Sequence, residues 1–155
     1  MLTKKSKYAI KALVALARHN DIKVPLRIAE IADKEKIPGK FLEAILLELR
    51  KHGILGSKKG VHGGYYLMKP PKEVLLSNVI RITDGPIALI PCVSINFYEK
   101  CEECTDEVTC GLREIALKVR DASLEILTNT SIADIVDREQ KLLAKAKLKK
   151  TTKKK

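Results

Sequence analysis

The sequence predicts a mainly α-helical protein with one small β-hairpin, in which a winged helix-turn-helix domain is followed by a long dimerisation helix. Three observations predict this fold class: helical periodicity in the first third, a glycine-rich basic hairpin after it, and a later helix with two apolar stripes. The chain has 155 residues, of which 45% are hydrophobic and 32% charged. This composition is typical of a folded chain that buries one core.

Helical spacing of apolar residues predicts three helices, over residues 6–19, 26–37 and 38–52. The second helix stops before Pro38, because the residue ahead of a proline disfavours the helical conformation. The third helix has apolar residues on one face: Leu42, Ile45, Leu46 and Leu49. Two helices separated by a tight turn therefore follow a first helix.

A β-hairpin follows the third helix. Strand-like runs at residues 54–58 and 65–68 flank the segment 59–64, whose glycines permit positive φ angles. This order of elements is the winged helix-turn-helix arrangement, in which the second helix of the motif enters the major groove and the hairpin reaches the neighbouring backbone.

Charge is segregated along the chain. Residues 1–69, 70–140 and 141–155 have net charges of +9, −6 and +8. A basic surface suits phosphate, and an acidic one does not. We therefore expect a winged helix-turn-helix DNA-binding domain over 1–69, a cysteine loop and dimerisation region over 70–140, and a disordered basic tail over 141–155, which adds non-specific affinity for DNA.

The apolar face of the third helix leaves its opposite face free to read DNA. There Glu43 can accept a hydrogen bond from a cytosine amino group, while lysines of the first helix and the hairpin bind phosphates. The alternative, a small helical domain with a solvated lysine face, is disfavoured by the hairpin. The predicted DNA contacts are Lys4, Lys5, Ser6, Tyr8, Lys40, Phe41, Glu43, Ala44, Ser57, Lys58, Lys59, Val61, His62 and Gly63.

Three further helices are predicted, over residues 76–83, 112–127 and 131–143. The long one has two apolar stripes, although one is enough to pack on its own domain, so we expect the other to bind a second copy in a homodimer. The predicted dimer interface comprises Leu112, Ile115, Val119, Ala122 and Ile126. Ser131 with Asp134 three residues later forms a variant of the capping box for the last helix.

Four cysteines lie between these helices, with the spacing C-x8-C-x2-C-x5-C: Cys92, Cys101, Cys104 and Cys110. The sequence has no signal-peptide pattern and no apolar run long enough for a membrane span, so we expect a cytoplasmic protein with reduced thiols. Thiolates bind iron-sulfur clusters and zinc, and spacing alone does not choose between them. A zinc site and a reversible disulfide switch therefore remain alternatives to a cluster.

A thiol redox enzyme that uses Cys101 and Cys104 is a further alternative. No strand-helix-strand pattern surrounds these cysteines, and the neighbouring acidic residues would raise their pKa values. We therefore expect no enzymatic activity.

Several blocks follow one another along the chain: residues 8–13 (YAIKAL), 28–32 (IAEIA), 41–43 (FLE), 49–55 (LRKHGIL), 59–65 (KGVHGGY), 79–81 (VIR) and 84–86 (DGP). Together they resemble the consecutive blocks of the IscR/NsrR/CymR family of bacterial transcription regulators. The resemblance covers about residues 1–137. It implies a dimeric winged-helix repressor or activator that binds partly palindromic promoter DNA and is often controlled by an iron-sulfur cluster on a three-cysteine loop.

The resemblance implies that Cys92, Cys104 and Cys110 are cluster ligands, whereas Cys101 is additional. The histidine ligand of the cluster-biogenesis sensors is replaced by Arg113, and the carboxylate ligand of the nitric-oxide sensors by Lys7. Cys101 is therefore the candidate fourth ligand of a [2Fe-2S] or [4Fe-4S] cluster. Since some members of the family lack these cysteines, a signal from a partner protein remains a further alternative.

Overall fold

The first part of the chain is a helical domain with a two-stranded hairpin. In the computed structural model, which describes residues 2–19 and 24–152, it comprises α1 (Lys4–Ala17), α2 (Ile28–Glu35), α3 (Gly39–Lys51), β1 (Leu55–Lys58) and β2 (Gly64–Leu67). The two strands are antiparallel. The predicted winged helix-turn-helix arrangement is confirmed, with each predicted element shifted by no more than a few residues.

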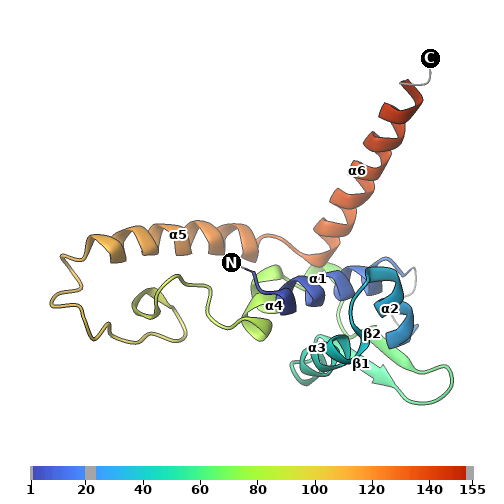
Figure 1. Ribbon diagram of the computed structural model, residues 1–155, viewed down its shortest axis with the longest axis horizontal. Coiled ribbons are helices and arrows are strands. Elements are labelled where there is room, and N and C mark those ends of the chain that lie inside the picture. The colour runs from blue at the N-terminus through green and yellow to red at the C-terminus, as the bar shows by residue number, and fades with distance from the viewer. Residues whose placement is uncertain (1, 20–23, 153–155) are drawn as a thin grey trace.

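The second part of the chain consists of α4 (Leu76–Thr83), α5 (Gly111–Thr128) and α6 (Ile132–Thr152), with a long irregular segment between α4 and α5. Figure 1 shows that α5 and this segment extend sideways from the N-terminal domain, while α6 projects from it in another direction. The hairpin lies at the end of the molecule that is remote from the irregular segment.

One hydrophobic core joins α1 to most other elements. Helix α1 contacts α2, α3, α4 and α6. Some of its partners lie well beyond the hairpin: Val74, Val79, Ile132 and Val136 are buried in the same core as the helix-turn-helix residues. The boundary expected at residue 69 is therefore not an edge of this core, because α4 and the first turns of α6 complete it.

Helix α6 is longer than the sequence indicated. It continues to Thr152, so the described part of the segment 141–155, which we expected to be disordered, is helical, and residues 153–155 lie outside the described part. Residues 141–148 are lysine, leucine and alanine, which favour a helix. Extending an existing helix requires no new nucleation, so the helix persists beyond its last core contact.

A second, smaller core lies beside α5. It contains the buried side chains of Cys92, Val93 and Ala116. The Arg120 guanidinium on α5 donates a hydrogen bond of 2.7 Å from Nη1 to the Val93 carbonyl and so fastens the irregular segment to the helix. None of the described helices is long and apolar enough to span a lipid bilayer.

Candidate nucleic-acid interface and cysteine site

Helix α3 separates a core face from a solvent face. Its apolar residues Leu42, Ile45, Leu46 and Leu49 are all fully buried. The side chains predicted to read DNA are on the other face and are exposed: Lys40, Phe41, Glu43 and Ala44. The predicted division of this helix is confirmed, and its exposed face is free to meet DNA.

The tip of the hairpin is a tight turn that only glycine fits. A Cβ atom on Gly63 would lie 2.3 Å from the carbonyl oxygen of Lys58, and Gly60 has a φ angle of +103°. The hairpin exposes four of the predicted DNA contacts: Lys58, Lys59, Val61 and His62. The hairpin therefore presents charged and apolar side chains on a compact backbone.

Two arginines support the hairpin, and sequence reasoning missed both. Arg27 donates from Nη2 to the Val61 carbonyl over 2.6 Å, and Arg50 donates from Nη1 to the Ser57 hydroxyl over 2.9 Å. Both residues are exposed, so they add positive charge beside the predicted contacts. Arg27 immediately precedes α2, and Arg50 lies in the last turn of α3. Exposed arginines are common at both kinds of position, so the periodicity of the sequence gives no signal for them.

The start of α1 contains four of the predicted DNA contacts, which differ in exposure and in the partners they contact. Lys4 is exposed, whereas Lys5 Nζ lies 2.7 Å from Glu48 Oε2 on α3, so this lysine already has a partner. The Tyr8 ring packs edge-on against the ring of Phe41, with centroids 5.8 Å apart. The two rings join α1 to the exposed face of α3.

Ser6, the fourth of these residues, is fully buried and cannot reach DNA in this conformation. Its hydroxyl shares a hydrogen bond of 2.5 Å with the hydroxyl of Thr83, at the end of α4. The prediction for Ser6 was wrong because it rested on position in the chain, whereas the helical phase turns this residue towards α4. Its role is to connect two helices.

The same junction includes a charged residue. Asp84 accepts a hydrogen bond of 3.0 Å from the Thr3 amide and another from the Thr3 hydroxyl, which also caps α1. Partial burial acts to raise the pKa of Asp84, but these hydrogen bonds and the nearby charge of Lys5 outweigh it and lower the pKa. An ionised Asp84 therefore joins the start of α1 to the end of α4.

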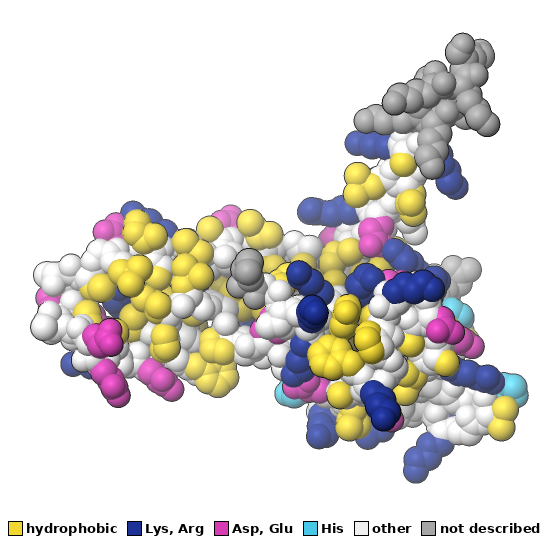
Figure 2. Space-filling view, viewed as in Figure 1, with side chains coloured by type: hydrophobic (Ala, Val, Ile, Leu, Met, Phe, Trp, Pro, Cys, Tyr) yellow, Lys and Arg dark blue, Asp and Glu magenta, His cyan; other side chains and the backbone are white. Residues whose placement is uncertain are grey.

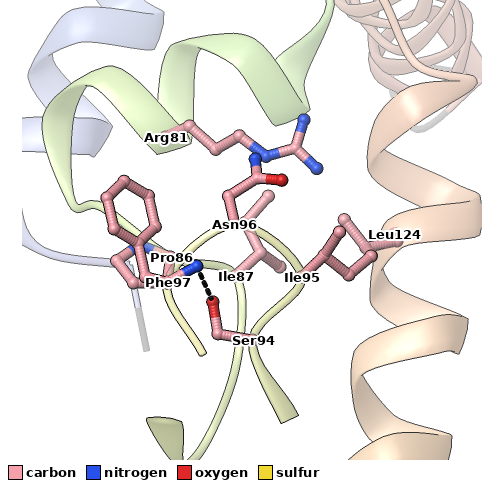
Figure 3. A pocket seen from close by; sticks show the side chains of 8 residues that line it. All are labelled: Arg81, Pro86, Ile87, Ser94, Ile95, Asn96, Phe97 and Leu124. Carbon is pink, nitrogen blue, oxygen red and sulfur yellow. Dashed lines mark hydrogen bonds between the residues drawn. The ribbon is translucent and has the colours of Figure 1, made fainter. Parts of the chain in front are cut away.

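The chain after Asp84 packs between α4 and α5. In Figure 3, the side chains of Ile95 and Asn96 lie between Arg81 on α4 and Leu124 on α5. The Phe97 amide donates to the Ser94 hydroxyl over 3.1 Å, which closes a tight turn there. The segment that carries the first cysteine thus contacts both helices.

Helix α5 leaves apolar side chains in contact with water. Its buried residue is Ala116, and Leu117, Leu124 and Leu127 are half-buried on the packed side. The stripe predicted to bind a second copy is exposed: Leu112, Ile115, Val119, Ala122 and Ile126. Figure 2 shows hydrophobic side chains gathered over this part of the molecule, while lysine and arginine side chains gather over the N-terminal domain.

All four cysteines line one hollow at the start of α5. Cys92 is buried in a 3-10 turn (Pro91–Val93), Cys101 is exposed, Cys104 is half-buried, and Cys110 is the N-cap of α5. Burial and a hydrogen bond with the Cys110 thiol raise the pKa of the Cys104 thiol. The sequence indicated this direction, but the cause is burial and thiol neighbours.

The hollow has the donors of a metal site in an open arrangement. Within residues 2–19 and 24–152, no three His, Cys, Asp or Glu side chains lie close enough to hold one metal ion. All four cysteines lie on the irregular segment between α4 and α5, and the described residues 94–110 of this segment form no helix or strand. The four thiols are therefore gathered around one space, and the segment must close for them to share a ligand.

A cation also lines this hollow. The Nε atom of Arg113 is buried and has no hydrogen-bond acceptor among the described residues. Its nearest carboxylate oxygen, on Glu107, lies 3.5 Å away, and that carboxylate accepts a hydrogen bond of 2.6 Å from the Tyr98 hydroxyl. This bond raises the pKa of Tyr98. Four thiols and a guanidinium whose Nε–H group has no acceptor fit a negatively charged metal-thiolate group.

Comparison with known proteins gives consistent matches over most of the chain. The model of the Rrf2 family, described as iron-dependent transcriptional regulators, matches residues 2–138. An rrf2-like HTH-type transcriptional regulator of Rhodobacter capsulatus is 41% identical, over 88% of this chain and 92% of that protein. The HTH-type transcriptional regulator NsrR of Bacillus licheniformis is 30% identical, over 92% of this chain and 99% of that protein.

The fold also matches a solved structure. The structure of CymR, the global cysteine regulator of B. subtilis, superposes with a TM-score of 0.72 at 26% identity, over 89% of this chain and 97% of that one. The resemblance expected from the sequence blocks is confirmed.

Proposed function

Because the chain belongs to the Rrf2 family of transcriptional regulators, we propose that it binds partly palindromic promoter DNA as a homodimer and that a cysteine-bound iron-sulfur cluster controls its affinity. One observation supports the control most directly: all four cysteines line a single hollow at the start of α5. Helix α5 also carries the exposed apolar stripe that is predicted to bind a second copy. A change at the cysteines is therefore adjacent to the predicted dimer contact.

DNA reading is assigned to α3 and the hairpin. The exposed Glu43 suits a cytosine amino group in the major groove, and Lys58 and Lys59 suit the phosphates beside it. In a two-fold symmetric dimer, the two α3 helices read half-sites about one helical turn apart, or a multiple of it. The operator should therefore be partly palindromic.

Dimerisation is assigned to the exposed stripe of α5. Ile126 and Leu112 are 66% and 67% exposed, which is unusual for large apolar side chains that line up along one helix. A second copy of α5 packed against this stripe would remove it from water. The spacing between the two DNA-reading domains then depends on how the two α5 helices meet.

The cluster ligands are Cys92, Cys104 and Cys110, with Cys101 as the fourth. When bound, the cluster supplies redox-active iron whose charge changes with electron transfer. The protein supplies four thiols and the burial of Cys92. Since the thiols stand apart, cluster binding and closure of the irregular segment are coupled, and a ligand shifts a conformational equilibrium only by binding one state better.

A connected path links the cysteines to the DNA-binding face. Beside Cys92, the Val93 carbonyl accepts from Arg120 on α5, and the following turn lies against α4. At the end of α4, the Thr83 hydroxyl shares a hydrogen bond with the Ser6 hydroxyl in α1. Ser6 is two residues from Lys4, an exposed lysine that we assign to DNA binding. A change in the conformation of the irregular segment would therefore alter the packing of α5 and, through α4, the position of α1.

The test compares cluster-loaded and cluster-free protein on one operator. The protein is purified without air, its visible absorption is recorded, and a duplex that it selects from a random-sequence pool is titrated into both forms. We expect thiolate-to-iron bands and unequal affinities. Because coupling is reciprocal, the operator should also change the affinity for the cluster.

Variants separate the roles of the residues. Cys92→Ala and Cys110→Ala should lose the absorption bands and the difference in affinity, whereas Thr105→Ala, in the same irregular segment, should keep both. Full absorbance in Cys110→Ala would show that the ligands are wrongly assigned. Bound metal without visible bands would indicate zinc, and equal operator affinity in every form would leave a DNA-binding regulator without this sensor.

A further inference from the structure

Arg113 occupies a costly position that no contact in the described residues explains. It lies in the first turn of α5, three residues after Cys110, and lines the same hollow as the four cysteines. Its Nε atom is shielded from solvent and has no acceptor. Leaving a buried N–H group unpaired costs free energy, more so when the group is charged. A protein keeps such a group where something else supplies the acceptor.

Glu107 does not satisfy this arginine. Its closer carboxylate oxygen is 3.5 Å from Nε, an ion-pair distance at which the N–H group still has no hydrogen-bond acceptor. The other oxygen of the carboxylate accepts from the Tyr98 hydroxyl at 2.6 Å, which holds the carboxylate towards that ring. The guanidinium is therefore only partly neutralised, and its shielded Nε–H group keeps no acceptor beside the hollow.

We propose that Arg113 is the counter-charge of the cysteine site, where its buried Nε–H group interacts with the sulfur atoms of the bound cluster and favours the reduced, more negative state. The proposal rests on the proposed cluster. Each one-electron reduction adds one negative charge to the cluster, and a cation nearby stabilises that state more than the oxidised one. Net charge and hydrogen bonds to sulfur are among the factors that set the potential of such clusters.

Glu107 has the opposite effect. Its carboxylate lies beside Arg113 and weakens the positive field at the hollow, so the two residues form a pair whose members shift the reduction potential in opposite directions. The balance between Arg113 and Glu107 thus sets the reduction potential of the cluster, and with it the strength of the reductant that is needed to reduce it. The role of Arg113 is to place positive charge beside the cluster, while the cysteines bind it.

The experiment measures iron and sulfide per chain, and the reduction potential by optical titration with dithionite, in protein loaded without air. Arg113→Gln should keep its iron and have a lower potential than the parent protein. Arg113→Lys should recover part of the difference, and Glu107→Gln should have a higher potential. Lys118→Gln removes the same charge from a mostly exposed position on α5 and should leave the potential unchanged.

The outcomes distinguish this proposal from the proposed function. A parent protein that binds no iron contradicts both. Iron in the parent with the same potential in Arg113→Gln contradicts only the role of Arg113. Loss of iron from folded Arg113→Gln but not from Arg113→Lys supports the charge role, whereas loss from both assigns Arg113 to the packing of the segment and overturns the proposal.

Discussion

The N-terminal domain and the cysteine region are stabilised by different means. In the N-terminal domain, one core contains fully buried side chains from α1, α2, α3 and the hairpin, completed by α4 and α6. In the cysteine region, the buried core consists of Cys92, Val93 and Ala116, and large apolar side chains of α5 face solvent. The first region has what it needs to fold within one chain. For the second, we propose that a second copy of α5 and a bound cluster complete it.

The contrast in assembly is tested most strongly at Val119, in the middle of the exposed stripe of α5. Val119→Glu should abolish the dimer, because an unpaired carboxylate would be buried at the interface. Light scattering should give the mass of a dimer for the parent protein and of a monomer for the variant. Glu125→Lys, on the polar side of α5, serves as the control and should stay dimeric. If the parent protein were a monomer, the prediction that the exposed stripe of α5 forms a dimer interface would be wrong.

The contrast in packing predicts a large loss of stability from one region only. Leu46→Ala removes a fully buried side chain of the N-terminal core and should lower the free energy of unfolding by about 2–5 kcal/mol. Leu112→Ala, at a position that is 67% exposed, should change the stability of the monomer by about 0.5 kcal/mol or less and instead weaken the dimer. Urea unfolding at low protein concentration measures the first effect, and its concentration dependence measures the second.

The contrast in charge predicts that lysines of the N-terminal domain bind DNA and that lysines of the cysteine region do not. Lys59→Ala should weaken binding to all sequences and reduce the slope of log affinity against log salt by about 1, whereas Lys100→Ala, in the acidic region, should have little effect. Glu43→Ala should mainly alter preference at one base pair, by about 1–3 kcal/mol. Anisotropy titrations on operator and random duplexes measure these changes. Equal losses on both duplexes for Glu43→Ala would exclude it from base reading.

The smallest effect concerns the junction where α6 joins the N-terminal core. Ser131 donates to the Asp134 carboxylate from its amide over 2.8 Å and from its hydroxyl over 2.6 Å, and these bonds lower the pKa of Asp134 below its ordinary value of 3.8. A lowered folded-state pKa means that the contribution to stability is present above the ordinary pKa and is lost as pH falls through the folded value. Urea unfolding between about pH 5 and pH 2 should show this loss in the parent protein.

The matched variants for this junction are Asp134→Asn and Ser131→Ala. Asp134→Asn should remove this part of the pH dependence. Ser131→Ala should cost about 1 kcal/mol at neutral pH, since it removes the helix cap. An unchanged pH profile in Asp134→Asn would mean that other carboxylates control acid unfolding.

Local patterns were enough to predict most elements of the fold. Apolar spacing fixed the faces of α3, and glycines marked the hairpin, because both signals depend on residues within one element. The sequence predicts too short an α6, because a helix that extends beyond the core has no apolar periodicity to mark it. Among the site residues, Ser6 and Lys5 were assigned to DNA by their position, yet their partners Thr83 and Glu48 lie far along the chain.

The sequence by itself determined the order of the helices, the basic hairpin and the presence of four cysteines, because periodicity, glycine and residue type are local properties. The tertiary structure alone decided which long-range partners meet. It brought Cys92 and Cys110 to one hollow and placed Arg113, whose Nε–H group has no acceptor, beside them. It also joined Asp84 to the start of α1. Such contacts depend on how whole helices pack, and no spacing within a single segment encodes them.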